Sequence, residues 1–225
     1  MKIGLIVVSI VALVLVGISL YLLDANRKLV LKANNIEQER AAIAAELEAR
    51  IAAVSQEKEE EIARLKGTYD ELVSSMQQEI EDGQITITQL ADRLSVSMVD
   101  KILFPSGEAE ITPEGLKVLE RVGNILKNTQ DKMIRVEGHT DNVPIHPNLQ
   151  DKFPTNWELS TARATNVVRF LQDKIGIKGI RLQAIGMSEY HPVARNETAA
   201  GRSQNRRIEI NLLPEFAGGI PLTSK

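Results

Sequence analysis

Residues 133–164, MIRVEGHTDNVPIHPNLQDKFPTNWELSTARA, decide the fold of the globular part of this chain. The segment 133–140 alternates apolar and polar side chains, a pattern that is typical of a half-buried strand. Thr155 and Glu158 then stand three positions apart before an apolar run. This is the spacing of a capping box, and it predicts a helix that extends to about Ile175. A strand, a polar loop and a helix in this order indicate an α/β domain.

The neighbouring segments extend this pattern in both directions. Thr112 before Pro113 places a capping residue ahead of a proline at the first helical position, which predicts the start of a second helix. The elements expected in the domain are a strand at 95–104, a helix at 112–128, a strand at 133–140, a helix at 155–175 and strands at 180–187 and 206–213. This β-α-β-α-β-β order gives an α/β domain large enough to form its own core.

A long apolar segment stands at the other end of the sequence. Residues 3–23 read IGLIVVSIVALVLVGISLYLL, 21 positions without a charge. As a helix this segment would be roughly 31 Å long, close to the thickness of the hydrocarbon layer of a bilayer. A cleavable signal peptide would have a shorter apolar region and a site of small residues, whereas the nearest candidate here, residues 23–25, reads LDA. The pattern therefore favours an uncleaved transmembrane signal anchor.

The charges beside this segment leave its orientation open. Lys2 precedes the anchor, while Arg27, Lys28 and Lys32 follow it. By the positive-inside rule alone, these charges favour a cytoplasmic location for the long C-terminal part.

Residues 24–82 have the composition of a long helix. They contain 14 acidic and 8 basic residues, no proline and a single glycine. Apolar positions recur about every 3.7 residues, which indicates one helical stripe. A regular coiled coil needs a period of 3.5, so the expectation is a loose self-association, most simply a parallel homodimer. The alternative is a single solvated helix supported by pairs such as Glu46–Arg50. A continuous helix of this length would reach roughly 90 Å.

Five segments result. They are a transmembrane anchor (1–23), a helical stalk (24–82), a connector that is ambiguous between helix end and strand (83–94), the α/β domain (95–214) and a flexible tail (215–225).

Composition excludes several classes of function. Lys and Arg together number 27 and Asp and Glu 30, for a net charge of −3, which argues against a nucleic-acid-binding protein. The absence of cysteine excludes disulfides, thiol catalysis, cysteine-ligated metals and lipidation of an N-terminal cysteine.

The histidines do not predict a metal or catalytic site. His139, His146 and His191 lack the spacing of metal ligands, and the carboxylates needed to complete a site cannot be placed from the sequence. His139 lies close to Asp141, but no nucleophile with a base and an orienting group accompanies them. We therefore expect no enzyme, no metal and no cofactor.

Four ordered motifs carry a family resemblance. They are ILFPSG at 102–107, VEGHTDN at 136–142, NWELSTARA at 156–164 and GRSQNRRIEI at 201–210. Together they resemble the OmpA-like domain, a family that includes the C-terminal domains of OmpA, Pal and the flagellar stator protein MotB. The insertion at 144–154 and the wording NWELS are closer to MotB. The resemblance implies noncovalent binding of peptidoglycan through the diaminopimelate of its stem peptide.

The resemblance also implies a binding site. Asp141 and Arg163 match the family's ligand-binding Asp and Arg, which suit the ammonium and the carboxylate of the zwitterionic diaminopimelate end. On the residues alone, Asp141 is better interpreted as a turn residue and Arg163 as a solvated helix arginine. Within the full set of motifs, ligand contact becomes the favoured interpretation of both. Further positions matching the pocket are Asn156, Thr140, Phe104 and Ser106.

Three further motif positions bear on the expected domain: Arg206, Arg207 and Pro105. Among Arg206 and Arg207, at least one is expected to have a structural role where the last strand begins. Pro105 departs from the family, which often has Asp there. It lacks an N–H and cannot donate from the backbone.

Three functions follow as expectations. The first is a non-catalytic tether between the inner membrane and peptidoglycan, with a single-pass anchor and the C-terminal domain in the periplasm of a diderm bacterium. The second is a MotB-like stator component with a membrane-protein partner. A stator needs an ionisable carboxylate inside its membrane helix, and residues 3–23 contain none, with Asp24 at the edge. The third is a scaffold whose stalk binds another protein.

Overall fold

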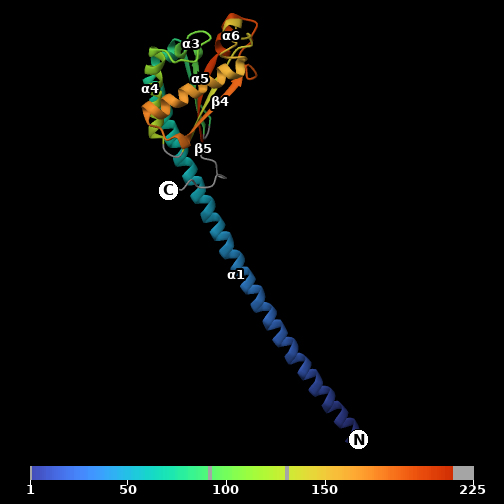
Figure 1. Cartoon of the computed structure of the whole chain (residues 1–225). Coiled ribbons are helices and arrows are strands. Elements are labelled where there is room, and N and C mark those ends of the chain that lie inside the picture. Colours follow the sequence, from blue (N-terminus) through green and yellow to red (C-terminus); the bar gives the residue numbers. More distant parts are fainter. Residues whose placement is uncertain (1, 91–92, 130–131, 215–225) are drawn as a thin grey trace. The chain divides into compact units, whose positions relative to one another are not determined.

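The computed structural model describes residues 2–90, 93–129 and 132–214, apart from the side chains of residues 2–12 and 14. The chain divides into two compact units, Met1–Glu59 and Glu60–Lys225. Helix α1 (Lys2–Ser75) forms the first unit and continues into the second, which contains all other elements (Figure 1).

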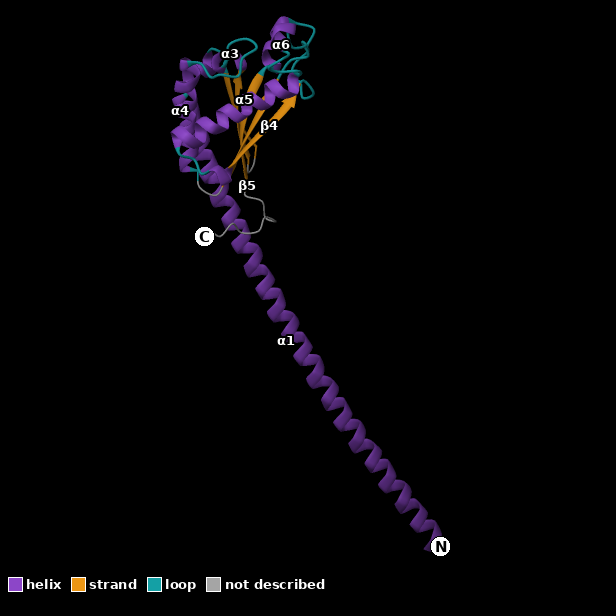
Figure 2. Cartoon of the chain, viewed as in Figure 1, coloured by secondary structure: helices purple, strands orange, loops and turns teal. Residues whose placement is uncertain are grey.

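A five-stranded sheet organises the second unit, with strand order β1-β2-β5-β3-β4. Figure 2 shows its strands in orange. The strands are β1 (Ile85–Leu90), β2 (Arg93–Val99), β3 (Lys132–His139), β4 (Leu182–Ser188) and β5 (Arg207–Pro214). β3 and β4 are parallel, and the other neighbours are antiparallel. The β-α-β-α-β-β order expected from the sequence is therefore present as a mixed α/β domain, with one strand added at the edge.

The helices of this unit are short except for two. They are α2 (Gln77–Glu81), α3 (Asp100–Leu103), α4 (Pro113–Asn128), α5 (Asn156–Phe170) and α6 (Ala199–Asn205). Thr112 caps α4 by accepting a 3.0 Å hydrogen bond from the Gly115 N–H, and the capping box predicted at Thr155 and Glu158 begins α5.

One face of the sheet forms the core because its strands alternate. Val96, Ile134 and Ile210 belong to three neighbouring strands and are buried in one cluster with apolar residues of α4 and α5. The two helices thus cover the apolar face, and the opposite face carries the polar positions of the same strands. Arg135, Glu137 and Glu209 are among these polar positions.

The predicted connector and first strand differ from the structure. Residues 85–90 and 93–99 form β1 and β2, which pair antiparallel with Ile85 opposite Met98. β2 ends at Val99 instead of Phe104, because Asp100–Leu103 turns into α3 and buries Leu103 and Phe104 in the core. The alternation of ITITQL, with Ile85 inward, explains the added strand.

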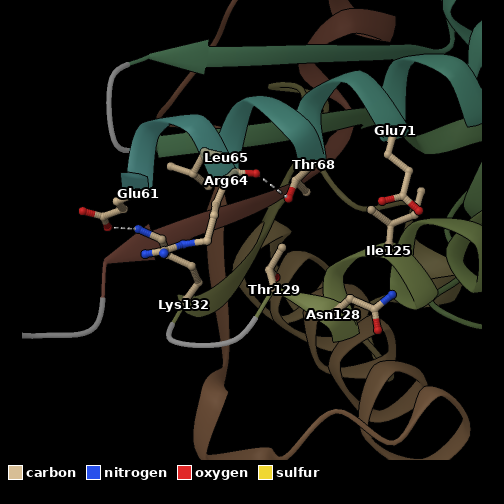
Figure 3. A pocket seen from close by; sticks show the side chains of 9 residues that line it. All are labelled: Glu61, Arg64, Leu65, Thr68, Glu71, Ile125, Asn128, Thr129 and Lys132. Atoms are coloured by element: carbon tan, nitrogen blue, oxygen red, sulfur yellow. Dashed lines mark hydrogen bonds and ion pairs between the residues drawn. The ribbon is translucent and has the colours of Figure 1, made fainter. Parts of the chain in front are cut away.

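The end of the predicted stalk is also part of the globular unit. Leu65, Leu72 and Met76 of α1 and its continuation are buried in the domain core. Lys132 at the start of β3 forms an ion pair with Glu61 of α1 (Figure 3). Residues 60–82 therefore pack against their own domain, which satisfies part of the apolar stripe without a second chain.

The candidate membrane segment lies in the first part of α1. Most of its side chains fall outside the described residues, as stated above. Within the part of the chain whose side chains are described, no helical stretch has the length and hydropathy needed to span a bilayer.

Candidate functional site

All six residues predicted for the binding site line one cavity of about 420 Å³. They come from three segments. The loop after α3 provides Phe104 and Ser106, the end of β3 leads into Thr140 and Asp141, and α5 supplies Asn156 and Arg163. The fold thus unites motifs that are separated in sequence, next to the C-terminal end of a strand and the beginning of a helix.

Two glycines let α5 approach the sheet. Gly138 of β3 and Gly186 of β4 are partners in the parallel pair. A Cβ at Gly138 would clash with the carbonyl oxygen of Ser160, and one at Gly186 would clash with Thr161. The Ser160 hydroxyl also accepts a 3.1 Å hydrogen bond from the Ser188 N–H. This close packing fixes the helix that carries Arg163.

Asp141 is buried and already has two partners. Its Oδ1 accepts a 3.1 Å hydrogen bond from the Val143 N–H, which closes a turn of the kind that aspartate favours. Its Oδ2 forms an ion pair with Arg206, whose side chain is 39% exposed. Both interpretations of Asp141, turn residue and charged site residue, therefore describe the same side chain.

Arg163 is 3% exposed and is held on several sides. Its Nη1 lies 3.0 Å from Oδ1 of Asp100, and its Nε donates a 2.7 Å hydrogen bond to the Glu108 carbonyl. The guanidinium carbon lies 4.9 Å from the centre of the Phe104 ring. Burial lowers the pKa of Arg163 from its ordinary value, although Asp100 opposes the change. Arg163 is therefore a fixed cation and not a solvated helix arginine.

Asp100 is the buried partner that sequence reasoning missed. Burial raises the pKa of its carboxyl to about 6, and the cations of Arg163 and Arg206 only partly offset that effect. Asp100, Asp141, Arg163 and Arg206 form what we call the four-charge cluster. With every group ionised, this cluster has no net charge.

The remaining predicted residues have unequal roles. The side-chain amide of Asn156 donates to the carbonyls of Asp141 and Val143 and, at 2.8 Å, to Glu189. It therefore holds the loop after β3 in place. The hydroxyl of Thr140 is buried, and within the described residues it has no hydrogen-bond partner. Thr140 thus offers the cavity an uncommitted polar group.

At the rim of the cavity near Pro105, the backbone contributes a carbonyl acceptor instead of an N–H donor. The Pro105 carbonyl accepts hydrogen bonds from the Glu108 N–H at 3.1 Å and from Nη2 of Arg163 at 3.4 Å. Proline at this position is therefore compatible with a contact to Arg163. Ser106 is exposed at the rim.

The two arginines that begin β5 have separate roles. Arg207 is buried and binds Glu209 together with the carbonyls of Asn205 and His191, which is a structural role. Arg206 points to Asp141 at the cavity. The sequence feature that could have identified Arg206 as a cavity residue is its place in the motif at 201–210. Asp100 lies outside all four motifs, so no sequence feature pointed to it.

A separate groove of about 510 Å³ lies between α1 and the end of α4 (Figure 3). Glu61, Arg64 and Leu65 of α1 form one side, and Ile125, Asn128 and Thr129 form the other. The groove shares no residue with the cavity of the four-charge cluster, so the predicted site lies elsewhere.

Comparison with known proteins agrees with this fold and its motifs. Residues 103–206 match the model of the OmpA family. "Motility protein B" of Bacillus subtilis is 37% identical over 134 residues, which are 60% of this chain, and the chain spans about half (50%) of that protein's length.

Two solved structures are similar as well. A putative MotB-like protein from Desulfovibrio vulgaris has a TM-score of 0.64 at 28% identity, covering 70% of this chain and 99% of that one. The cell wall anchor of the T6SS from Pseudomonas aeruginosa has a TM-score of 0.58 at 34% identity, covering 64% and 97%. The chain therefore contains an OmpA-like domain at residues 103–206, and similar proteins of that domain include ones of the MotB type.

Proposed function

We propose that the domain binds peptidoglycan noncovalently through the free end of a diaminopimelate side chain. The observation that carries this proposal is the four-charge cluster on the cavity, since it offers buried partners for both charges of a zwitterion. Two further points support it: the four motifs that resemble the OmpA-like domain, and the similarity to the cell wall anchor of the T6SS from Pseudomonas aeruginosa.

In this proposal the ligand exchanges partners within the cluster. Its ammonium binds the Asp141 carboxylate beside Arg206, and its carboxylate binds Arg163 opposite Asp100. The exposed side chain of Arg206 has room to move, whereas Arg163 is held by Glu108 and Phe104 and keeps its orientation. The hydroxyl of Thr140 supplies a further hydrogen bond. Because the guanidinium is planar, Arg163 fits a carboxylate better than a lysine would.

The four-charge cluster supports ligand binding without catalysis. Hydrolysis of a glycan would need two carboxylates at the bond to be broken or a metal-bound water. Here both carboxylates of the cluster are paired with arginines, one as a turn residue and one as a buried partner. We therefore assign the domain a non-catalytic role.

Calorimetric titration with a diaminopimelate-containing stem peptide tests the assignment. Asp141→Ala and Arg163→Ala each leave a ligand charge without its partner, which costs about 2–5 kcal/mol, roughly a 30- to 5,000-fold loss of affinity. Arg163→Lys is expected to fail nearly as badly. A stem peptide whose diaminopimelate carboxyl is an amide should mimic the loss of Arg163.

Arg169→Ala is the matched control, because Arg169 is an exposed arginine on the same helix. Its affinity should equal that of the wild type, and circular dichroism should show that every variant is folded. If folded Asp141→Ala and Arg163→Ala variants bind like the wild type, the site is wrong and the scaffold function of the stalk becomes the better proposal.

We further propose that residues 3–23 anchor the chain in the inner membrane, with residues 24–225 in the periplasm. The support is the length of the uncharged run together with the requirement that a wall-binding domain faces the wall. Protease added to spheroplasts should degrade the globular domain. Full protection of the domain in intact spheroplasts, with degradation after lysis, would contradict this topology.

A stator function is the second candidate, favoured by the MotB-type relatives. It would depend on Asp24, the carboxylate at the edge of the apolar run, which pairs with Lys28 at 2.7 Å. Asp24→Asn should then abolish ion-driven motility, whereas a static tether would tolerate the substitution.

A further inference from the structure

A second polar cluster lies on the face of the sheet opposite the helices. Glu137 and His139 point to that face from β3, and Glu209 points to it from β5. Glu137 and Glu209 are directly opposite each other in the antiparallel pair. One donor atom from each of the three side chains lies within 4.8 Å of the others. None of the three residues lines the cavity of the four-charge cluster.

His139 is the unusual member of this cluster. Its side chain is only 3% exposed, and within the described residues neither ring nitrogen has a hydrogen-bond partner. Nε2 lies 3.7 Å from Oε2 of Glu137, too far for a hydrogen bond. Because buried polar groups nearly always form hydrogen bonds, a buried imidazole without one, next to two carboxylates, points to a missing ligand.

The two glutamates favour a cation as that partner. Like charges directly opposite each other on neighbouring strands destabilise a sheet. Arginines already orient the carboxylates: Nε of Arg207 lies 2.6 Å from Oε1 of Glu209, and Nη1 of Arg135 lies 3.9 Å from Oε1 of Glu137. Oε2 of Glu137 is the oxygen that faces His139. Such outer partners are typical of carboxylates that ligate metals.

We propose that Glu137, His139 and Glu209 form a binding site for a divalent transition metal, with Zn²⁺ as the best-fitting ion. One imidazole nitrogen and two carboxylate oxygens are ligands that zinc accepts, and water completes a tetrahedral set. The imidazole disfavours Mg²⁺ and Ca²⁺, which prefer oxygen donors alone. Small side-chain rotations bring atoms that lie within 4.8 Å to the spacing that a single ion requires. The bound ion links β3 to β5.

Calorimetry with ZnCl₂ on the full chain in detergent, first freed of metal with a chelator, tests this site. We expect one Zn²⁺ per chain with a dissociation constant in the micromolar range or tighter, and at least tenfold weaker binding for His139→Ala and for Glu209→Gln. Saturating Zn²⁺ should raise the midpoint of thermal unfolding of the wild type, and this rise should vanish in both variants. Co²⁺ in place of Zn²⁺ should give absorption bands that depend on His139.

His146→Ala is the matched control, since His146 is an exposed histidine on a loop away from the cluster, and it should bind Zn²⁺ like the wild type. Glu209 is only partly buried, so Glu209→Gln keeps the test valid if His139→Ala fails to fold. A wild type that binds no Zn²⁺ overturns the proposal. Equal binding by wild type and a folded Glu209→Gln variant overturns it too.

Discussion

The fold disfavours ionisation of the Asp100 carboxyl group, because it buries this group. Burial raises its pKa from 3.8 to about 6, so the folded chain binds this proton more tightly than the unfolded chain does. The resulting stabilisation is present in full below about pH 3.8 and is lost as the pH rises through about 6. Two pKa units correspond to about 3 kcal/mol.

Asp100→Asn removes this titration. We expect the free energy of unfolding of the wild type, minus that of the variant, to fall by about 2 kcal/mol between pH 4 and pH 7, because part of the full effect is already lost at pH 4. Denaturant unfolding of both proteins at a series of pH values measures it. A difference that stays constant across this range would show that Asp100 titrates normally.

Two ion pairs lie at the cavity, Asp141–Arg206 and Arg163–Asp100. The sequence predicted Asp141 and Arg163 as site residues but did not predict their partners. Asp141 and Arg163 stand in motifs, and the expected strand and helix place them. Asp100 lies where a strand was expected to continue, and only the turn into α3 directs it to Arg163. The sequence also could not predict which carboxylates lie beside His139. Glu137 and Glu209 are 72 positions apart in the sequence, and only the register of β3 and β5 places them opposite each other.

At the scale of elements, α1 has two parts with different surroundings. Leu72 is fully buried in the domain core, whereas Leu47 is 57% exposed. Leu72→Ala should lower the free energy of unfolding by about 2–5 kcal/mol, because it leaves a cavity. Leu47→Ala should change it by less than about 0.5 kcal/mol. Chemical denaturation of the two variants checks the boundary at Glu60, and equal effects would refute it.

The contact of α5 with the sheet gives a second element-scale prediction. Gly138→Ala forces a methyl group against the Ser160 carbonyl and should cost about 1–3 kcal/mol. Gly67→Ala is the control, since Gly67 lies in an exposed part of α1 with open space around it, and should stabilise the chain by up to about 1 kcal/mol. Thermal unfolding distinguishes them. Similar small effects for both would mean that α5 does not pack closely.

At the scale of the whole molecule, the exposed part of the apolar stripe predicts self-association. Ile43, Leu47, Ile51 and Val54 are all exposed on α1. We propose that they pair with a second chain in parallel, as a homodimer. Sedimentation of residues 24–225 should show a species heavier than the monomer that grows with concentration. The double variant Leu47→Lys and Ile51→Lys should stay monomeric. A wild type that is monomeric at high micromolar concentration favours the solvated single helix.

The ion pair between Glu61 and Lys132 has a mechanical consequence for the proposed tether. It joins α1 to the start of β3, while Asp141 follows the end of that strand. If the domain is the tether proposed above, the part of a pull that passes from α1 through this ion pair to the cavity runs along β3, which has β4 on one side and β5 on the other. Since the hydrogen bonds of the antiparallel β3–β5 ladder are perpendicular to the strands, this pull shears them together instead of opening them one by one. A tether of this geometry would resist a pull along the strand more strongly than a pull across it, so its strength would depend on the direction of the force.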